Sequence, residues 1–163
     1  MAIVSGLMFR LVDWAARRGI VPEVSPTLTA KQVAARKGVR GETYAYWYLR
    51  RKGYVFIARN YTAAGYKGEI DLIGYDGPVL AFVEVKTRTT DSAKASTSDG
   101  AIAAKPEDAI TADKRRVLSR MARRFLTERR IDEAPWRFDV LAIESAPGRR
   151  PVVRLHKDAF AAG

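Results

Sequence analysis

Two neighbouring segments of the chain have the composition of buried β-strands and yet carry charged residues inside them. These segments are GEIDLI at residues 68–73 and LAFVEVK at residues 80–86. The turn residues Tyr-Asp-Gly-Pro at 75–78 between them predict a hairpin. Because side chains on a strand alternate between its two faces, Glu84 and Lys86 share a face, and the hairpin can bring Asp71 beside Glu84. Any fold of this sequence therefore has to accommodate two neighbouring carboxylates in a sheet.

Two carboxylates held close together need a compensating charge or a proton. At an effective dielectric constant near 20 they repel each other by a few kcal/mol, and removing each from water costs several more. A raised pKa on one of them or a bound cation offsets this cost. Oxygen ligands favour Mg²⁺ or Mn²⁺ over zinc, and the chain has no cysteine and one histidine.

Such a cation would polarise a phosphate oxygen and lower the pKa of a bound water, while Lys86 would orient that water or stabilise the developing charge. This set of groups is suited to phosphodiester hydrolysis. The alternative from spacing alone is a solvated network of Asp71, Glu84 and Lys86 on a half-exposed strand. The apolar residues that flank Glu84 favour the buried site.

The chain carries 29 lysine and arginine residues against 18 aspartate and glutamate residues, a net charge of +11 over 163 residues. A surplus of this size indicates a polyanionic partner, most often nucleic acid and less often an anionic membrane. The absence of cysteine excludes a disulfide framework, a thiolate zinc site and a cysteine nucleophile. The single histidine, His156, disfavours a Ser-His-Asp triad.

Much of the positive charge lies in one predicted helix, at residues 113–130, which has one apolar stripe and eight basic side chains around the remainder. Only two acidic residues offset them, so we expect this helix to contact phosphates rather than to present an ordinary solvated face. The candidate nucleic-acid-binding residues are Lys114, Arg115, Arg116, Arg120 and Arg123, together with Arg88 after the charged strand. For Arg88, a solvated end-of-strand position is the alternative.

The remaining pattern predicts an α/β domain at residues 31–163, preceded by a helix and a proline-containing linker over residues 1–30. Within the domain, the expected elements are a helix over 31–51, strands at 54–61, 69–74 and 79–86, the helix at 113–130, and strands at 136–143 and 152–155. Residues 89–108, rich in small polar residues, are expected to form a mobile loop. This order of elements indicates a central mixed sheet flanked by helices.

The first 20 residues predict an amphipathic helix, because apolar residues recur at positions 3/4, 7/8, 11/12 and 15. Such a helix packs on its own domain or on a partner, and a membrane-surface helix is the alternative. No stretch reaches the roughly 18 consecutive apolar residues that a membrane-spanning helix requires. No basic segment precedes the apolar start, which disfavours a secretory signal, so we expect a cytoplasmic protein.

The charged strands also belong to a series of motifs that resembles the YraN family. This family lies within the PD-(D/E)xK nuclease superfamily and is similar to archaeal Holliday-junction resolvases. The matching motifs are, in order, GETYA (41–45), RNY (59–61), GEIDLI (68–73), FVEVKTR (82–88), KPEDAI (105–110) with Lys114, and RFDV (137–140). The chain departs from the family pattern at residues 1–30 and in a longer loop at 91–99, and these departures concern partners and substrate entry rather than the chemistry.

The resemblance implies a restriction-endonuclease-like core with an Mg²⁺ or Mn²⁺ site. In that core Asp71 and Glu84 would be the acidic metal ligands, Val85 would contribute its backbone carbonyl, and Lys86 would be the catalytic lysine. The resemblance also implies that Glu42, on the first helix of the domain, reaches the metal directly or through water.

Two further acidic residues are candidates for the same site. Glu69 shares the face of Asp71 and is either an additional ligand or a residue that closes the turn at Gly68. Asp139 is expected to be a structural partner of a basic residue rather than a ligand.

We therefore expect a metal-dependent endonuclease that acts on DNA, with branched or structured DNA as candidate substrates. The resemblance to junction resolvases also allows a homodimer. The alternative is a catalytically weak or inactive nucleic-acid-binding or scaffold protein on the same fold. A third hypothesis is that the N-terminal helix docks a protein partner or a membrane surface.

Overall fold

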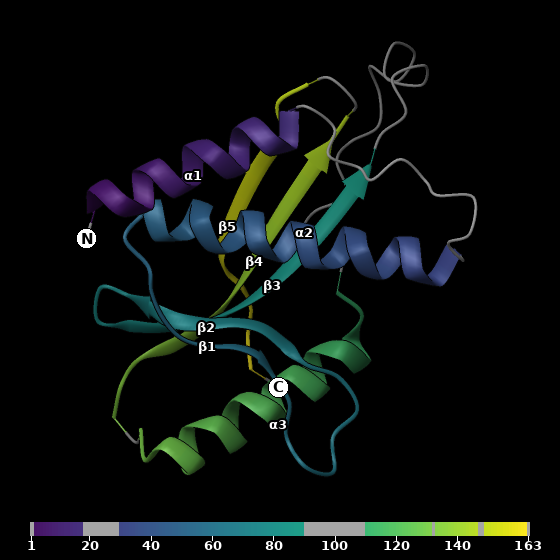
Figure 1. The fold of residues 1–163 in the computed structure, drawn as a ribbon. Helices are drawn as coiled ribbons and strands as arrows, with labels where there is room; N and C mark the ends of the chain where they lie inside the picture. Colours follow the sequence, from purple (N-terminus) through teal and green to yellow (C-terminus); the bar gives the residue numbers. More distant parts are fainter. Residues whose placement is uncertain (1, 18–29, 90–109, 132, 147–148, 163) are drawn as a thin grey trace. The chain divides into compact units, whose positions relative to one another are not determined.

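The computed structural model describes residues 2–17, 30–89, 110–131, 133–146 and 149–162. Its elements are α1 (Ala2–Arg17), α2 (Ala30–Arg51), β1 (Val55–Tyr61), β2 (Ile70–Asp76), β3 (Val79–Thr89), α3 (Ala112–Arg129), β4 (Trp136–Ser145) and β5 (Val152–Phe160) (Figure 1). The expected linker and the expected loop at 89–108 lie almost entirely outside the described residues. None of the described helices is long and apolar enough to cross a membrane.

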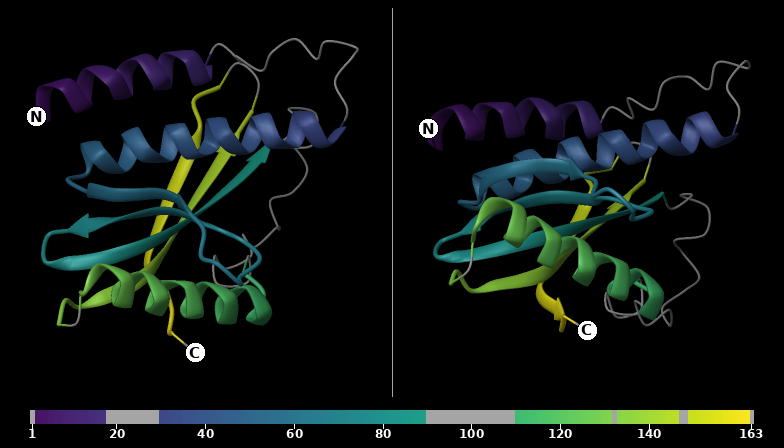
Figure 2. Two further views of the ribbon diagram at one scale, coloured as in Figure 1. Left: turned by 60° about the horizontal axis from the view of Figure 1, so that its bottom comes forward. Right: turned by 90° about the horizontal axis from the view of Figure 1, so that it is seen from below.

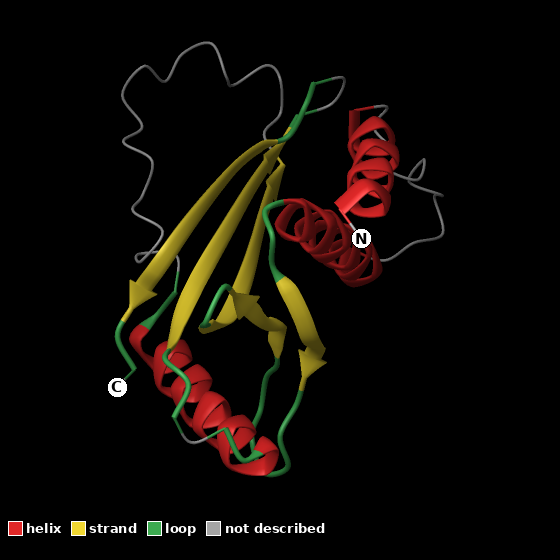
Figure 3. Ribbon diagram, turned by 90° about the vertical axis from the view of Figure 1, so that its left-hand side faces the viewer, coloured by secondary structure: helices red, strands yellow, loops and turns green. Residues whose placement is uncertain are grey.

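The five strands form one sheet in the order β1-β2-β3-β4-β5, which twists as Figure 3 shows. β1 pairs with β2 and β2 with β3 in antiparallel fashion. β3 and β4 run in the same direction, and the connection between them contains α3 (Figure 1). The mixed sheet confirms the expected α/β fold and is consistent with a nuclease-like core.

By its internal contacts the chain divides into two units. The first comprises Met1–Lys52, Val85–Ile102 and Ala142–Arg154, and the second comprises Gly53–Glu84, Ala103–Leu141 and Leu155–Gly163.

In the first unit, α1 lies beside α2, as both views of Figure 2 show. The ring of Phe9 packs edge-on against Tyr44, at 5.6 Å between centroids. Asp13 is buried and accepts hydrogen bonds from Tyr44, Arg17 and Arg150. Burial acts to raise the pKa of Asp13, but the hydrogen bonds outweigh it and hold the pKa below its ordinary value. This charged network fastens one face of α1 to α2.

The structure confirms the N-terminal helix and shows which face it buries. Ser5, Phe9 and Asp13 are buried. Of the predicted apolar stripe, Met8 and Val12 are half-buried, whereas Val4, Leu7 and Leu11 are exposed. Part of the stripe is therefore not covered by this chain, because one aromatic ring and a multiply hydrogen-bonded carboxylate of α1 fit against α2.

A close contact sets α2 against the end of β3 within the first unit. Gly41 is buried, and a Cβ atom at this position would collide with the Oγ1 atom of Thr87. The glycine thus lets the helix backbone approach the strand. Glu42, the next residue of α2, is half-buried beside this contact.

In the second unit, α3 packs its apolar face on the sheet. Phe125 of α3 meets Phe82 of β3 edge-on, with centroids 6.0 Å apart, and both side chains are almost fully buried. The helix begins at Thr111, whose hydroxyl accepts a hydrogen bond from the backbone N–H of Lys114. It ends at Arg130, whose left-handed backbone closes the last turn. Both helix ends are therefore satisfied by local hydrogen bonds.

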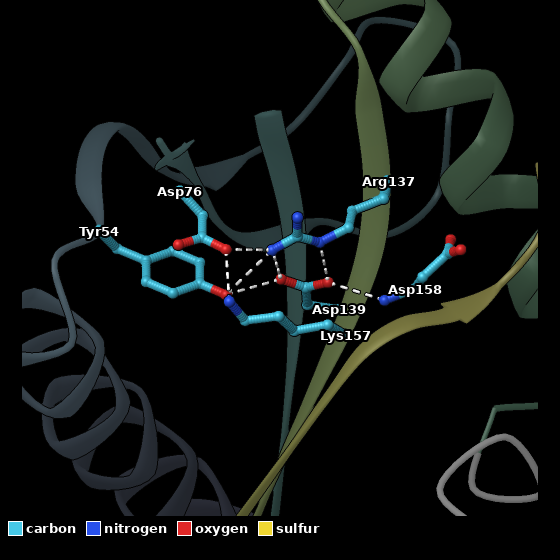
Figure 4. Close-up of polar contacts among 6 residues, drawn as sticks. All are labelled: Tyr54, Asp76, Arg137, Asp139, Lys157 and Asp158. Atoms are coloured by element: carbon cyan, nitrogen blue, oxygen red, sulfur yellow. Dashed lines mark hydrogen bonds and ion pairs between the residues drawn. The ribbon is translucent and has the colours of Figure 1, made fainter. Parts of the chain in front are cut away.

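A charged network connects the end of β2, the start of β4 and the second half of β5 (Figure 4). Arg137 donates to Asp139 at 2.8 Å and to Asp76 at 2.5 Å. Tyr54 donates its hydroxyl to Asp139 at 2.9 Å, and Lys157 donates to Asp76 at 2.6 Å. The fully buried Asp139 is therefore a structural partner of a basic residue, as the sequence predicted.

The contact at Gly41 predicts opposite effects for two glycine substitutions in helices. Gly41→Ala should lower the free energy of unfolding by about 1–3 kcal/mol, because the new methyl group overlaps Thr87. Gly6→Ala in α1 should raise it by about 0.5–1 kcal/mol, because open space surrounds that position and alanine favours a helix. Urea unfolding measures both. Adding Thr87→Ala to Gly41→Ala should recover part of the loss, and equal effects of both glycine variants would contradict this packing.

The ion pairs of Asp76 predict a pH-dependent contribution to stability. The hydrogen bond from Lys157, aided by that from Arg137, outweighs burial and lowers the pKa of Asp76 below its ordinary value. Its stabilising contribution is therefore present above about pH 4 and lost as the pH falls through the lower folded-state value. Asp76→Asn should cost about 1–2 kcal/mol at pH 6 and progressively less as the pH falls below about 4.

Urea unfolding at a series of pH values measures this difference. Asp113→Asn is the matched control, since that side chain is highly exposed in its pair with Arg116. A difference between wild type and Asp76→Asn that stays constant with pH would show that the ion pairs contribute no pH-dependent stability.

Candidate metal centre

Two acidic side chains lie beside the β2–β3 hairpin, one on each strand. Leu72 pairs with Val83 and Ile73 with Phe82, and Asp71 and Glu84 are the residues immediately beyond the last pair. Because side chains alternate along a strand, both leave it on the face that carries Ile73 and Phe82. Asp71 is 8% exposed and Glu84 is 5% exposed. The turn between the strands therefore creates a buried pair of like charges in the second unit.

The burial of this pair follows from its position on the sheet. Ile73 and Phe82 form the neighbouring pair on the same face, and Phe82 packs against Phe125 of α3. The two carboxylates thus lie on the side of the hairpin that α3 covers. Two carboxylates about 5 Å apart repel each other by about 3 kcal/mol at an effective dielectric constant near 20.

A lysine from α3 supplies one compensating charge. Lys114 Nζ lies 2.6 Å from Glu84 Oε1. The Thr111 cap fixes the first turn of α3 and with it the start of the lysine side chain. Lys114 lies on the inner face of α3, the face that also carries Leu118 and Met121. Sequence reasoning placed this lysine among the phosphate contacts and did not foresee its ion pair with Glu84.

Lys86 stands two residues beyond Glu84 on β3. Because side chains alternate along a strand, the two side chains leave β3 on the same face. Lys86 and the intervening Val85 are both half-buried, whereas Arg88 at the end of the strand is exposed. The strand therefore presents an amine and a carboxylate on one face, in the order that the sequence predicted.

Glu69 extends the acidic pair toward solvent. It precedes β2, is exposed, and has a carboxylate oxygen within 4.8 Å of one of Asp71. The expected shared face of Glu69 and Asp71 thus brings their oxygens together. Glu42 lies on α2, half-buried, next to the glycine that contacts Thr87.

The candidate DNA-binding arginines of α3 are in different surroundings. Arg115 is half-buried, donates to the backbone carbonyl of Ile110 at 3.0 Å and lies over the ring of Phe160. Arg116, Arg120 and Arg123 are exposed, at a helical spacing that puts them in one row. This arginine row faces away from the sheet, on the opposite side of α3 from Lys114.

The donor set in the second unit suits a hard divalent cation. Asp71 and Glu69 offer carboxylate oxygens within 4.8 Å of each other, and Glu84 on the next strand carries a further carboxylate; Mg²⁺ and Mn²⁺ prefer oxygen ligands of this kind. Two of the three side chains are buried, so the negative charge is concentrated where water screens it poorly. The residues present therefore fit a cation of this class.

Comparison with known proteins places the chain among bacterial relatives of undefined role. Residues 41–143 match the profile of Uncharacterised protein family UPF0102. A UPF0102 protein of Koribacter versatilis is 34% identical over 161 residues, covering 98% of this chain and 96% of the relative. A UPF0102 protein of Symbiobacterium thermophilum is 41% identical over 128 residues, covering 78% of this chain and 98% of the relative.

The matched ranges show which parts of this chain its relatives share. The matched residues 41–143 contain Glu42, the whole β2–β3 hairpin and α3. The Koribacter relative aligns over almost the full length, whereas the shorter Symbiobacterium relative leaves about a fifth of this chain unmatched. The acidic pair therefore lies inside the shared core. By its motifs, its fold and these relatives, the chain belongs to the UPF0102 (YraN) family.

Proposed function

We propose that this protein is a metal-dependent endonuclease that hydrolyses phosphodiester bonds in DNA. The observation that carries the proposal is the buried Asp71–Glu84 pair on adjacent strands, with Lys86 on the same face of β3. A stable fold gains nothing from such a pair by itself, because like charges repel and their burial removes hydration. Function is therefore the simplest reason for the arrangement.

The metal ligands in this proposal are Asp71 and Glu84, with the backbone carbonyl of Val85 and the carboxylate of Glu42. Glu69 lies at the side of the site that faces solvent. A bound Mg²⁺ or Mn²⁺ supplies Lewis-acid polarisation of the phosphate and a more acidic water.

The side chains of the protein perform the remaining tasks. The Lys86 ammonium orients the attacking water and stabilises the negative charge that develops on the phosphate oxygens. Lys114 balances one of the two buried negative charges through its ion pair with Glu84. Burial on the α3 side keeps bulk water from screening these interactions.

The charge distribution supports DNA as the substrate. The net charge is +11, and the arginine row formed by Arg116, Arg120 and Arg123 presents guanidinium groups that can contact phosphates. This row faces away from the acidic pair, so a straight duplex at the acidic site does not readily reach it. A bent or branched DNA offers phosphates to both surfaces, and a homodimer would present two such sites to one branched molecule.

The second candidate is a DNA-binding or scaffold protein with little or no turnover. The Lys114–Glu84 ion pair favours this alternative, because it already neutralises one carboxylate without a metal. In that case Asp71 and Glu84 remain as a structural pair, and the arginine row alone accounts for DNA binding. The two candidates differ in cleavage and in their response to divalent cations.

The endonuclease proposal predicts metal-dependent nicking that depends on Lys86. Full-length protein with Mn²⁺ should convert supercoiled DNA to the nicked form and should cut branched DNA, whereas EDTA should stop both reactions. Lys86→Ala should lower the nicking rate about 100-fold or more while retaining DNA affinity, since the amine acts on the reacting groups. Gel assays measure cleavage, and fluorescence anisotropy measures binding.

Lys52→Ala is the matched control for that experiment, since Lys52 is an exposed lysine outside the site. Its nicking rate should equal that of wild type. DNA binding without cleavage of any tested substrate in Mn²⁺ would favour the scaffold protein. Equal cleavage by Lys86→Ala and wild type would assign the activity to other residues or to a contaminant.

Removing one charge of the acidic pair should stabilise the metal-free protein and weaken metal binding. Without metal, Asp71→Asn should raise the free energy of unfolding by about 1 kcal/mol, because it removes part of a repulsion of about 3 kcal/mol. With Mn²⁺ at about 100 times its Kd, wild type should gain about 2.7 kcal/mol and Asp71→Asn little or nothing. Urea unfolding in EDTA and in Mn²⁺ measures both effects. A variant that is less stable than wild type in EDTA and equally stabilised by Mn²⁺ would show that Asp71 is structural.

A further inference from the structure

Helix α1 carries a row of large apolar side chains that face outward. Val4 is 63% exposed, Leu7 60%, Leu11 53% and Trp14 51%. Their spacing of three, four and three residues puts them on one stripe of the helix, here called the α1 stripe. A surface of this kind on a helix marks an interaction site more often than an ordinary solvated face.

The other side of α1 is held firmly by the first unit. Ser5, Phe9 and Asp13 are buried, and Asp13 accepts hydrogen bonds from α2 and from Arg150. The helix therefore cannot turn its apolar stripe inward without breaking the charged network. The outward direction of the stripe is part of the fold.

A basic cavity of about 410 Å³ shares Trp14 with the α1 stripe. Its lining consists of Phe9, Arg10, Asp13, Trp14, Arg17, Arg51 and Arg150. Asp13 forms ion pairs with Arg17 and Arg150. In the described part of the chain no carboxylate forms an ion pair with Arg10, and Arg51 lies over the ring of Phe9. The cavity thus combines four guanidinium groups with one carboxylate.

We propose that α1 binds the surface of an anionic phospholipid membrane. The α1 stripe enters the boundary between headgroups and acyl chains, and the basic cavity holds a headgroup phosphate. Trp14 lines both the stripe and the cavity, so its ring lies at the level where apolar and polar regions meet. An amphipathic helix with arginines beside its apolar face is suited to lie in this interface.

The composition of the surface favours a membrane over two other occupants. A nucleic acid would match the arginines, but it offers nothing apolar to three exposed aliphatic side chains. A second copy of α1 would cover the stripe, but it would bring two arginine-lined cavities together and repel. An anionic lipid surface satisfies both the apolar and the cationic part.

The inference is independent of the proposed nuclease chemistry. Arg51 lies nine positions after Glu42 on α2, which is two and a half helical turns. The two side chains therefore leave α2 on opposite sides. A lipid headgroup in the cavity does not occupy the position that Glu42 takes in the proposed metal site.

Vesicle sedimentation of the full-length protein in EDTA tests the inference. Vesicles of phosphatidylglycerol and phosphatidylcholine should bind the protein, and vesicles of phosphatidylcholine alone should bind it at least tenfold less. The double variant Leu7→Gln with Leu11→Gln should lower binding to the anionic vesicles about tenfold or more. The matched control is Val55→Gln with Ile57→Gln on β1, where the side chains are 55% and 45% exposed, and it should bind like wild type.

Two further variants make the test specific. Arg10→Gln with Arg51→Gln should weaken binding to anionic vesicles about fivefold for each charge removed. Lys86→Ala should bind vesicles like wild type, whether or not it has lost nuclease activity.

Three results would overturn the inference. The first is equal vesicle binding by wild type and the leucine variant, when circular dichroism shows that both are folded. The second is equal binding to anionic and neutral vesicles. The third is a dimer in sedimentation equilibrium that the leucine variant loses, with no vesicle binding by wild type.

Discussion

The burial of two carboxylates, Asp71 on β2 and Glu84 on β3, is the constraint around which the second unit is organised. Two carboxylates at adjacent strand positions, both more than 90% buried, repel each other and lose hydration. A lysine of α3, Lys114, forms an ion pair with Glu84 from the helix turn that Thr111 caps. The hairpin, the cap and the orientation of α3 are therefore linked through one electrostatic requirement.

The sequence predicted the parts of the fold that depend on local pattern. Alternation along two short strands, with a turn between them, was sufficient to predict the antiparallel hairpin of β2 and β3. The periodicity of residues 113–130 likewise predicted α3 almost to its ends. These features are local, so a single sequence contains the information that they need.

The features that the sequence did not predict depend on contacts between distant residues. Lys114 and Arg116 look equivalent in the sequence, and only the rotation of α3 on the sheet directs one toward Glu84 and the other to solvent. The buried face of α1 was not predicted for the same reason, because Asp13 pairs with Arg150 from the other end of the chain. β5 extends to Phe160, beyond the expected end at residue 155, where Lys157 pairs with Asp76.

The basic residues of the chain have different surroundings. Arg137 and Lys114 are used inside the protein, where each compensates a buried or half-buried carboxylate. The arginine row of α3 and the cavity beside α1 leave guanidinium groups for external anions. Net charge alone does not distinguish these surroundings, since the arginine row of α3 is on an exposed helix face whereas the arginines beside α1 line a cavity.

The proposed function requires the acidic pair on β2 and β3 to bind a divalent cation. Crystals of the full-length protein soaked in Mn²⁺, with X-ray data collected at the manganese absorption edge, test this claim most directly. We predict one anomalous peak within bonding distance, about 2.0–2.4 Å, of carboxylate oxygens of both Asp71 and Glu84. No peak at this pair under saturating Mn²⁺, with Lys114 still bound to Glu84, would contradict the account.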